Sequence, residues 1–226
     1  MIDISAVMPA YNERGNIGQA VEQLDSFLRK KFKKYELIVV NDGSIDGTDK
    51  ELTALKVKYK NLRVLNNKKN LGYGATVWKG LRKARGEIIF TTDSDLQFDI
   101  RELGKFLVKI KSCDAVIGYR KIRSEGKIRV FNAWGWRLIC RVLLGIQFKD
   151  IDCAFKLIKR SFIRKIKINS SGATFSAELL YKMQEDNCRI EELPVAHLPR
   201  IKGRATGANL RVILRAILEM FKLFNE

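Results

Sequence analysis

The stretch Tyr35-Glu-Leu-Ile-Val-Val-Asn-Asp-Gly-Ser-Ile-Asp-Gly-Thr48 decides the fold class of this 226-residue chain. Its first six residues form a β-rich run that Asn41-Asp42-Gly43 ends. A helical pattern then covers Thr48–Tyr59, and either Asp46 or Thr48 can cap its start. A strand that passes through a glycine-containing loop into a helix predicts one unit of a parallel α/β sheet.

The same alternation continues on both sides of this stretch. The further strands predicted in the first half are Ile2–Met8, Leu62–Leu65 and Glu87–Thr92, and the first of them is expected to end at Pro9. The further helices predicted there are 15–32 and Tyr73–Ala84. This βαβαβαβ order predicts an α/β fold with a mostly parallel central sheet and helices on both faces. In such sheets ligands bind beyond the carboxyl ends of the strands. The segments at those ends are 9–14, 41–47, 66–74 and 92–97.

The second half is less regular. Its predicted elements are helices at Asp99–Lys111 and Thr174–Glu185 and strands at Ala115–Gly118 and Arg189–Val195, with an apolar, arginine-containing segment at 128–146. The charged residues of 209–225 follow one another at spacings of four, four and three, so they share one narrow stripe of an otherwise apolar helix. Such a helix must lie against the protein core, a partner chain or a membrane interface.

The chain is strongly basic. It has 43 Lys plus Arg and 25 Asp plus Glu, which gives a formal net charge of +18. Residues 1–100 hold 17 basic and 13 acidic residues, a net of +4, so the other +14 belongs to 101–226. Such an excess indicates an anionic partner, and nucleic acid, a phosphate-bearing substrate and an anionic membrane surface all qualify.

The sequence predicts neither disulfides nor a zinc site, and neither a signal peptide nor a membrane-spanning helix. The four cysteines form no C-x-x-C pair and no histidine lies at metal-ligand spacing, which favours reduced thiols in a cytoplasmic protein over disulfides or zinc. The first residues enter a strand rather than a signal peptide, and no uncharged apolar stretch reaches the roughly 18–20 residues of a membrane-spanning helix.

Two acidic residues directly follow the strand Glu87–Thr92. Asp93 and Asp95 are separated by one residue and can share one hard cation, since Mg²⁺ and Mn²⁺ prefer oxygen ligands and often bridge to phosphates. The alternative is that Asp95 or Asp99 caps the next helix. The apolar strand before the pair and Gln97 after it favour the metal site.

Four segments together resemble the family 2 glycosyltransferases. They are Pro9-Ala-Tyr-Asn-Glu13, Val40-Asn-Asp-Gly-Ser-x-Asp-Gly-Thr48, Asn70-Leu-Gly-Tyr-Gly-Ala75 and Asp93-Ser-Asp-Leu-Gln97. Their order and spacing are most similar to the polyprenyl-phosphate branch, which includes the dolichyl-phosphate mannose synthases. The resemblance implies a GT-A nucleotide-diphospho-sugar transferase fold over 1–206, with a nucleotide-sugar and metal half at 1–120 and an acceptor half at 121–206. The amphipathic helix at 207–226 would follow it.

The resemblance also implies individual site residues. Those expected to bind the nucleotide sugar are Pro9, Tyr11, Glu13, Val40, Asp42, Asp93 and Ser94. Those expected to hold Mg²⁺ or Mn²⁺ are Asp93, Asp95 and Gln97. Those expected to be catalytic are Asp95 and three arginines suited to phosphate contacts, Arg120, Arg129 and Arg200. After Gly203 the sequence departs from the family pattern, because Arg204, Ala205 and Thr206 stand where x-Ser-Lys is usual.

These features predict an inverting, metal-dependent transfer of a hexose. The donor would be GDP-mannose or a UDP-sugar, and the acceptor a dolichyl or undecaprenyl phosphate at the cytoplasmic face of a membrane. The acceptor phosphate is already ionised at neutral pH and needs no strong base, so the single histidine, His197, is expected to be structural. The basic second half would meet the anionic membrane surface, and a homo-oligomer or a membrane-protein partner stays open.

Two alternatives compete with this prediction. A family 2 enzyme that glycosylates a saccharide hydroxyl needs a base, and Asp150 or Asp152 could serve. A nucleic-acid-binding module would explain the charge, but the sequence has neither an aromatic-interleaved basic motif nor a known reader fold, so no nucleic-acid partner is expected.

Overall fold

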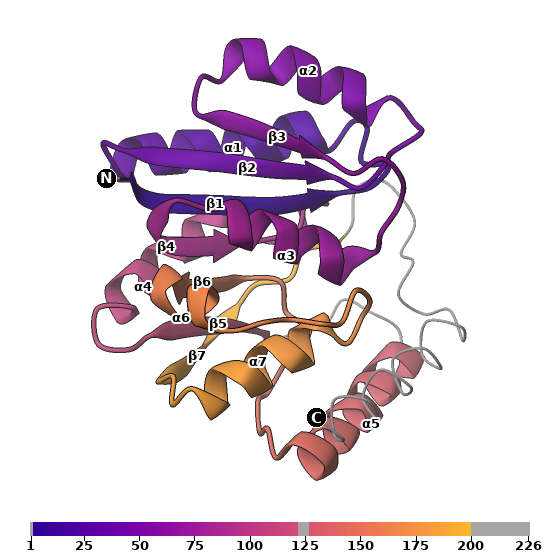
Figure 1. The fold of residues 1–226 in the computed structure, drawn as a ribbon, viewed down its shortest axis with the longest axis vertical. Helices are drawn as coiled ribbons and strands as arrows, with labels where there is room; N and C mark the ends of the chain where they lie inside the picture. Colours follow the sequence, from indigo (N-terminus) through magenta and orange to yellow (C-terminus); the bar gives the residue numbers. More distant parts are fainter. Residues whose placement is uncertain (1, 122–126, 200–226) are drawn as a thin grey trace.

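A seven-stranded sheet forms the centre of the molecule in a computed structural model that describes residues 2–121 and 127–199 (Figure 1). The strands are β1 (Ile2–Ala10), β2 (Tyr35–Asn41), β3 (Leu62–Asn66), β4 (Gly86–Thr91), β5 (Ala115–Arg120), β6 (Lys156–Lys159) and β7 (Ile190–Val195). The helices are α1 (Ile17–Lys31), α2 (Thr48–Lys58), α3 (Tyr73–Lys83), α4 (Leu103–Lys109), α5 (Lys127–Leu144), α6 (Arg160–Lys165) and α7 (Phe175–Glu185), with a 3₁₀ turn at Ile100–Glu102.

The predicted α/β class and mostly parallel sheet are confirmed. The strand order is β3-β2-β1-β4-β6-β5-β7, and only β6 runs antiparallel to its neighbours β4 and β5. We did not predict β6, because it has four residues and leads straight into α6, which leaves no periodic pattern to detect.

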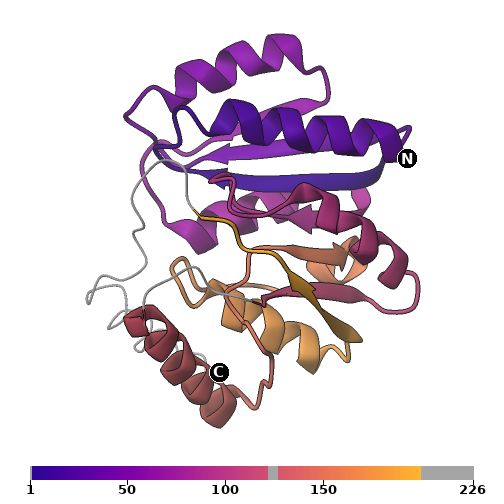
Figure 2. The same cartoon turned by 180° about the vertical axis from the view of Figure 1, so that it is seen from behind.

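Helices cover both faces of this sheet. Figure 1 shows α3, α6 and α7 in front of it, and Figure 2, seen from behind, shows α1 and α4 on the opposite face. Each face carries its own buried apolar cluster. A third cluster fastens the end of α5 to α7 through residues such as Cys140, Leu144, Ala177 and Leu180. β1 runs parallel to both β2 and β4, so the carboxyl ends of these three strands lie at one edge of the sheet, as the sequence predicts.

The first strand is longer than predicted. β1 continues through Pro9 to Ala10, where we expected an end at Pro9. The ladder to β4 stops at the pair Val7–Thr91, so the missing N–H of Pro9 is not required on that side. The Pro9 carbonyl instead accepts a hydrogen bond from Ser94 Oγ at 2.8 Å, which fastens the loop after β4 to β1.

The helix at 207–226 and its charged stripe lie outside the described residues, so the division at residue 206 stays a prediction. Among the helices that are described, none has both the length and the apolar character needed to cross a bilayer.

A buried glutamate links three parts of the first half. Glu36 of β2 is 2% exposed and accepts hydrogen bonds from Ser5 Oγ at 2.7 Å, Arg63 Nη1 at 2.6 Å and the Arg85 N–H at 2.7 Å. Burial by itself raises the pKa of Glu36, but the hydrogen bonds from Arg63, Ser5 and Arg85 outweigh it, so the net pKa lies below its ordinary value.

Glu36→Gln is expected to lower the free energy of unfolding by about 1.5–3 kcal/mol at about pH 7, the range for hydrogen bonds to a charged group. The folded-state pKa lies below the unfolded one, so this stabilisation is present above the unfolded pKa and disappears as the pH falls through the folded pKa. Urea unfolding at a series of pH values measures the gap to wild type, with the exposed Glu87→Gln of β4 as matched control. A gap that does not shrink on acidification contradicts this account.

Candidate functional site

The loop after β4 is held in one conformation by its own polar groups. Asp95 Oδ1 accepts a hydrogen bond from the Gln97 N–H at 3.1 Å, and Leu96 between them has a left-handed φ of 63°. Asp99 accepts from the Arg101 N–H at 2.9 Å and caps the 3₁₀ turn. The capping alternative is thus confirmed for Asp99, whereas the Asp95 side chain closes the turn of its own loop.

Asp93 and Asp95 lie close enough to affect each other's charge. Burial, and then the negative charge of Asp95, raise the pKa of Asp93 to about 7. A hydrogen bond from Tyr73 and the positive charges of Lys156 and Arg120 oppose that rise. Groups from α3, β5 and β6 therefore act on Asp93 in the loop after β4.

This donor set fits a hard divalent cation. Two adjacent carboxylates that repel each other in a partly desolvated site are stabilised by a cation between them. Within the described part of the chain, no three His, Cys, Asp or Glu side chains are grouped as metal ligands. A cation at Asp93 and Asp95 would be completed by a substrate phosphate, since Mg²⁺ is usually bound by one or two carboxylates together with phosphates.

Two residues of this cluster were missed from the sequence. Lys156 is 3% exposed, its Nζ donates to the carbonyls of Ile151 at 3.2 Å and of Cys153, and burial lowers its pKa. A lysine inside an apolar run was the available signal. Tyr73 begins α3 with its ring 6.5 Å from that of Phe175, and the sequence included it in a segment that resembles the family without giving it a role of its own.

Asp42 has a more structural place than predicted. Its Oδ1 accepts from Asn67 Nδ2 at 2.7 Å and from the Leu71 N–H at 2.9 Å, and its Oδ2 accepts from the Gly72 N–H at 3.0 Å. The side chain therefore fixes the loop between β3 and α3, which leaves less hydrogen-bonding capacity for a nucleotide base than we expected. The neighbouring Gly43 has φ 68°, and a Cβ there would lie 2.6 Å from the Lys69 carbonyl carbon, so this close approach requires glycine.

The other residues predicted to bind the nucleotide differ in accessibility. Tyr11 is 41% exposed, which suits contact with a base. Glu13 accepts from Asn16 Nδ2 at 2.8 Å. Val40 is fully buried within the apolar cluster that includes residues of α3, so in this structure it is not exposed to a ligand.

One of the three predicted arginines has a well-defined partner. Arg120 Nε and Nη2 donate to Asp150 Oδ2 and Oδ1 at 2.7 and 2.9 Å, and the Arg120 N–H donates to Oδ2 at 3.2 Å. A carboxylate held by a guanidinium in this way is a poor general base, so the hydroxyl-acceptor alternative would depend on the exposed Asp152. The Arg129 side chain, within α5, and Arg200 lie outside what the structure describes.

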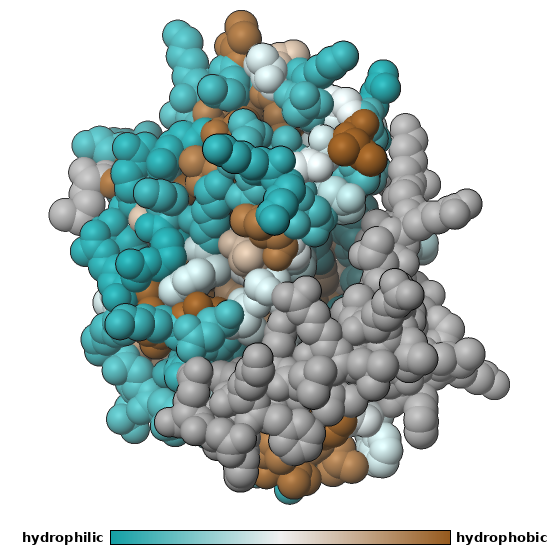
Figure 3. Space-filling view, turned by 45° about the vertical axis from the view of Figure 1, so that its right-hand side comes forward, coloured by the Kyte–Doolittle hydropathy of each residue, from teal (hydrophilic) through white to brown (hydrophobic). Residues whose placement is uncertain are grey.

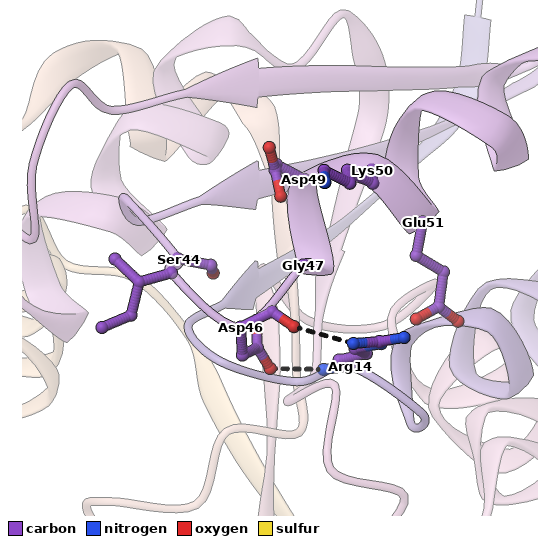
Figure 4. A pocket seen from close by; sticks show the side chains of 8 residues that line it. Arg14, Ser44, Asp46, Gly47, Asp49, Lys50 and Glu51 are labelled. Carbon is purple, nitrogen blue, oxygen red and sulfur yellow. Dashed lines mark hydrogen bonds between the residues drawn. The ribbon is translucent and has the colours of Figure 1, made fainter.

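Two open cavities flank the site on the side of α2. The larger, of about 760 Å³, is lined by Arg14, Ser44, Ile45, Asp46, Gly47, Asp49, Lys50 and Glu51 (Figure 4). Asp46 and Glu51 already accept hydrogen bonds from the backbone around them, as the bond from the Arg14 N–H to Asp46 Oδ2 at 3.0 Å illustrates. The smaller cavity, of about 450 Å³, reaches Asn41, Gly43 and Asn67. Neither cavity is lined by Asp93 or Asp95.

α5 carries an exposed apolar stripe. Trp134, Leu138 and Val142 recur every fourth residue and are 54%, 47% and 71% exposed, whereas Cys140 and Leu144 on the other side are buried. Figure 3 shows apolar side chains gathered at the bottom of the molecule, where α5 ends. This exposed row makes one face of α5 a candidate contact surface.

Comparison with known proteins gives one consistent family. The model of glycosyl transferase family 2 matches residues 5–167. The chain is 28% identical to a dodecaprenyl-phosphate galacturonate synthase of Rhizobium johnstonii, over 97% of this chain and 67% of that protein. It is 31% identical to a dolichyl-phosphate beta-glucosyltransferase of Trichomonas vaginalis, over 84% of this chain and 62% of that protein. The chain thus spans about two thirds of the length of these curated relatives.

Solved structures support the fold. Glucosyl-3-phosphoglycerate synthase from Mycobacterium tuberculosis in complex with Mn²⁺ and UDP-glucose superposes with a TM-score of 0.72 at 22% identity, over 97% of this chain and 79% of that one. The same enzyme with Mg²⁺ and UDP gives a TM-score of 0.72 at 20% identity. The predicted GT-A architecture is confirmed by these likenesses.

Proposed function

Because the chain belongs to glycosyl transferase family 2, we propose that this glycosyltransferase moves a hexose or hexuronic acid from a nucleoside-diphosphate sugar to a polyprenyl phosphate. The observation that carries the proposal is that the positive charges of Arg120 and Lys156 act on Asp93 of the acidic pair Asp93 and Asp95. The acidic pair suits a metal-bound diphosphate, and the partly exposed guanidinium of Arg120 suits a second phosphate. Two relatives whose names specify polyprenyl-phosphate products add support.

On the donor side, Tyr11 would lie along the base while Asp42 holds the loop between β3 and α3 in place. Asp93, Asp95 and Gln97 would hold Mg²⁺ or Mn²⁺, which when bound stabilises the negative charge that develops on the departing diphosphate. Ser94 would keep these ligands in place through its hydrogen bond to the Pro9 carbonyl.

On the acceptor side, Arg120 would bring positive charge to the lipid phosphate, in an orientation set by its two hydrogen bonds to Asp150. Arg129 and Arg200 keep the acceptor-binding role that the sequence predicts. The acceptor oxygen is ionised at neutral pH, so the attack needs no deprotonation. A single displacement inverts the anomeric carbon and gives a β-linked product from an α-linked donor.

A panel assay tests this function. The protein is incubated with UDP-glucose, UDP-galacturonate or GDP-mannose, with Mg²⁺, Mn²⁺ or a chelator, and with a short polyprenyl phosphate or a saccharide acceptor. Mass analysis should find a polyprenyl-phosphate sugar with one donor, and only when a divalent cation is present. A product on the saccharide hydroxyl alone would contradict the proposal and support the alternative with Asp152 as base.

We further propose that the apolar stripe of α5 lies on an anionic membrane surface, with the basic second half providing electrostatic attraction. Changing Trp134, Leu138 and Val142 together to serine is expected to lower co-sedimentation with anionic vesicles by at least about tenfold, since three apolar side chains lose their insertion energy. The matched control changes Val57 of α2 and Val108 of α4, which are 84% and 71% exposed, to serine. Equal co-sedimentation of the stripe variant and wild type would contradict the proposal that α5 lies on the membrane surface.

A further inference from the structure

The loop after β4 is paired with the chain that follows β7. We name residues 95–98 the metal loop and residues 196–199 the exit segment. The Leu198 N–H donates to the Gln97 carbonyl at 2.8 Å, and Gln97 Nε2 donates to the Leu198 carbonyl at 3.1 Å. Phe98 and His197 form an antiparallel bridge beside this pair, with ring centroids 5.4 Å apart.

The hydrogen bond to Leu198 determines how the Gln97 amide is oriented. A backbone carbonyl only accepts, so the amide NH₂ must face Leu198. The amide oxygen is then the atom that Gln97 can offer to a cation, as the donor set at Asp93 and Asp95 requires. The Gln97 amide nitrogen thus binds Leu198, and its amide oxygen is available to a cation.

The hydrogen bonds between Gln97 and Leu198 lie between the proposed metal ligands and the proposed acceptor residue Arg200. The Asp95 carboxylate accepts from the Gln97 N–H, so two of the proposed metal ligands are hydrogen-bonded to each other within the metal loop. Phe98 packs against Phe155 with ring centroids 5.6 Å apart, which anchors the loop on the core just before Lys156. The exit segment continues in the sequence into Arg200, for which the acceptor role is proposed.

We propose that Gln97 is a positioning residue that couples the donor and acceptor halves of the enzyme. Its amide oxygen responds to the cation and the diphosphate, and its amide NH₂ holds the exit segment. Occupation of the donor site would therefore order the exit segment, and by reciprocity an ordered exit segment would favour donor binding. This inference rests on the proposed function, whose metal site it uses.

The deciding variant is Gln97→Glu, which keeps an oxygen ligand but replaces the donor to Leu198 with an acceptor. The matched control is Leu198→Ala, which removes a side chain that is 42% exposed and leaves both backbone groups in place. Hydrogen exchange of the Leu198 amide, measured without metal and with Mn²⁺ plus UDP, reports the state of the exit segment independently of transfer.

In wild type and in Leu198→Ala, Mn²⁺ plus UDP should slow exchange at Leu198. In Gln97→Glu, exchange without metal should be roughly 2- to 10-fold faster, as expected for one lost hydrogen bond, and Mn²⁺ plus UDP should no longer slow it. Calorimetry should still detect Mn²⁺ binding to Gln97→Glu in the presence of UDP. The KM for the lipid acceptor should rise, and the KM for the donor should rise as well, because donor binding loses the support of the ordered exit segment.

Two results would overturn the coupling. One is exchange at Leu198 that is the same in folded Gln97→Glu and in wild type, and the other is wild-type exchange that does not respond to Mn²⁺ plus UDP. A failure of the proposed function would look different. No lipid product would form with any donor, yet the exchange measurements would still decide whether Gln97 links the two segments.

Discussion

Replacing Asp95 by alanine is expected to lower metal-dependent sugar transfer by about a thousandfold or more. Stabilisation of the departing diphosphate by a bound cation is worth several kcal/mol, and about 4 kcal/mol corresponds to a factor of a thousand in rate. Asp95 is 6% exposed and its charge acts on Asp93 in the same loop, so the two carboxylates are suited to share one cation. Initial rates with saturating Mg²⁺ or Mn²⁺ and calorimetric Mn²⁺ binding with UDP measure both consequences.

Asp99→Ala is the matched control for this variant. Asp99 lies four residues further along and caps the 3₁₀ turn, so its loss should cost about 1 kcal/mol of stability and leave transfer near the wild-type rate. If Asp95→Ala retained full metal-dependent transfer, the metal site would have to be placed elsewhere.

Replacing Arg120 by methionine is expected to reduce transfer by about a hundredfold or more and to destabilise the fold. The Arg120 and Asp150 side chains are 12% and 3% exposed, and removing one partner of a buried ion pair typically costs about 3–5 kcal/mol. On the acceptor, the loss of a guanidinium should appear mainly as weaker use of the lipid phosphate. Urea unfolding separates the stability effect from kcat and KM measured on folded protein.

The partner variant Asp150→Asn tests how Arg120 is oriented. If Asp150 positions Arg120, Asp150→Asn should lower transfer in the same direction, and the double variant should be less impaired than the sum of the two effects. Arg101→Met is the control, because Arg101 is 88% exposed in its pair with Asp99 and surface pairs contribute little. A variant of Arg120 with wild-type acceptor KM and kcat would show that this arginine does not face the acceptor.

The sequence predicts the donor half well because each piece of information there is local. An apolar run followed by Asn41-Asp42-Gly43 or by Asp93-Ser94-Asp95 identifies both a strand and the polar loop at its end. Parallel order then places those loops at one edge, and the structure has them there. For these elements the pattern and the topology rule suffice.

What the sequence does not predict depends on contacts between distant positions. Asp42 meets Leu71 and Gly72 across 29 and 30 residues, and Arg120 meets Asp150 across 30, so no local spacing indicates either partner. Lys156 belongs to a strand too short to show a period, and its burial beside Asp93 depends on β6 pairing between β4 and β5. The metal and acceptor roles remain proposals that the experiments above address.

The most direct measurement offers the enzyme two acceptors that differ only in the phosphate. Polyprenyl phosphate and the matching polyprenyl alcohol are mixed in equal amounts with the nucleotide sugar and Mn²⁺, and the products are identified by mass. We expect sugar on the phosphate alone, because the proposed role of Arg120 favours an anionic acceptor and an ionised phosphate needs no base. Glycosylation of the alcohol at a comparable rate would contradict transfer to a lipid phosphate and, with it, the central claim about this site.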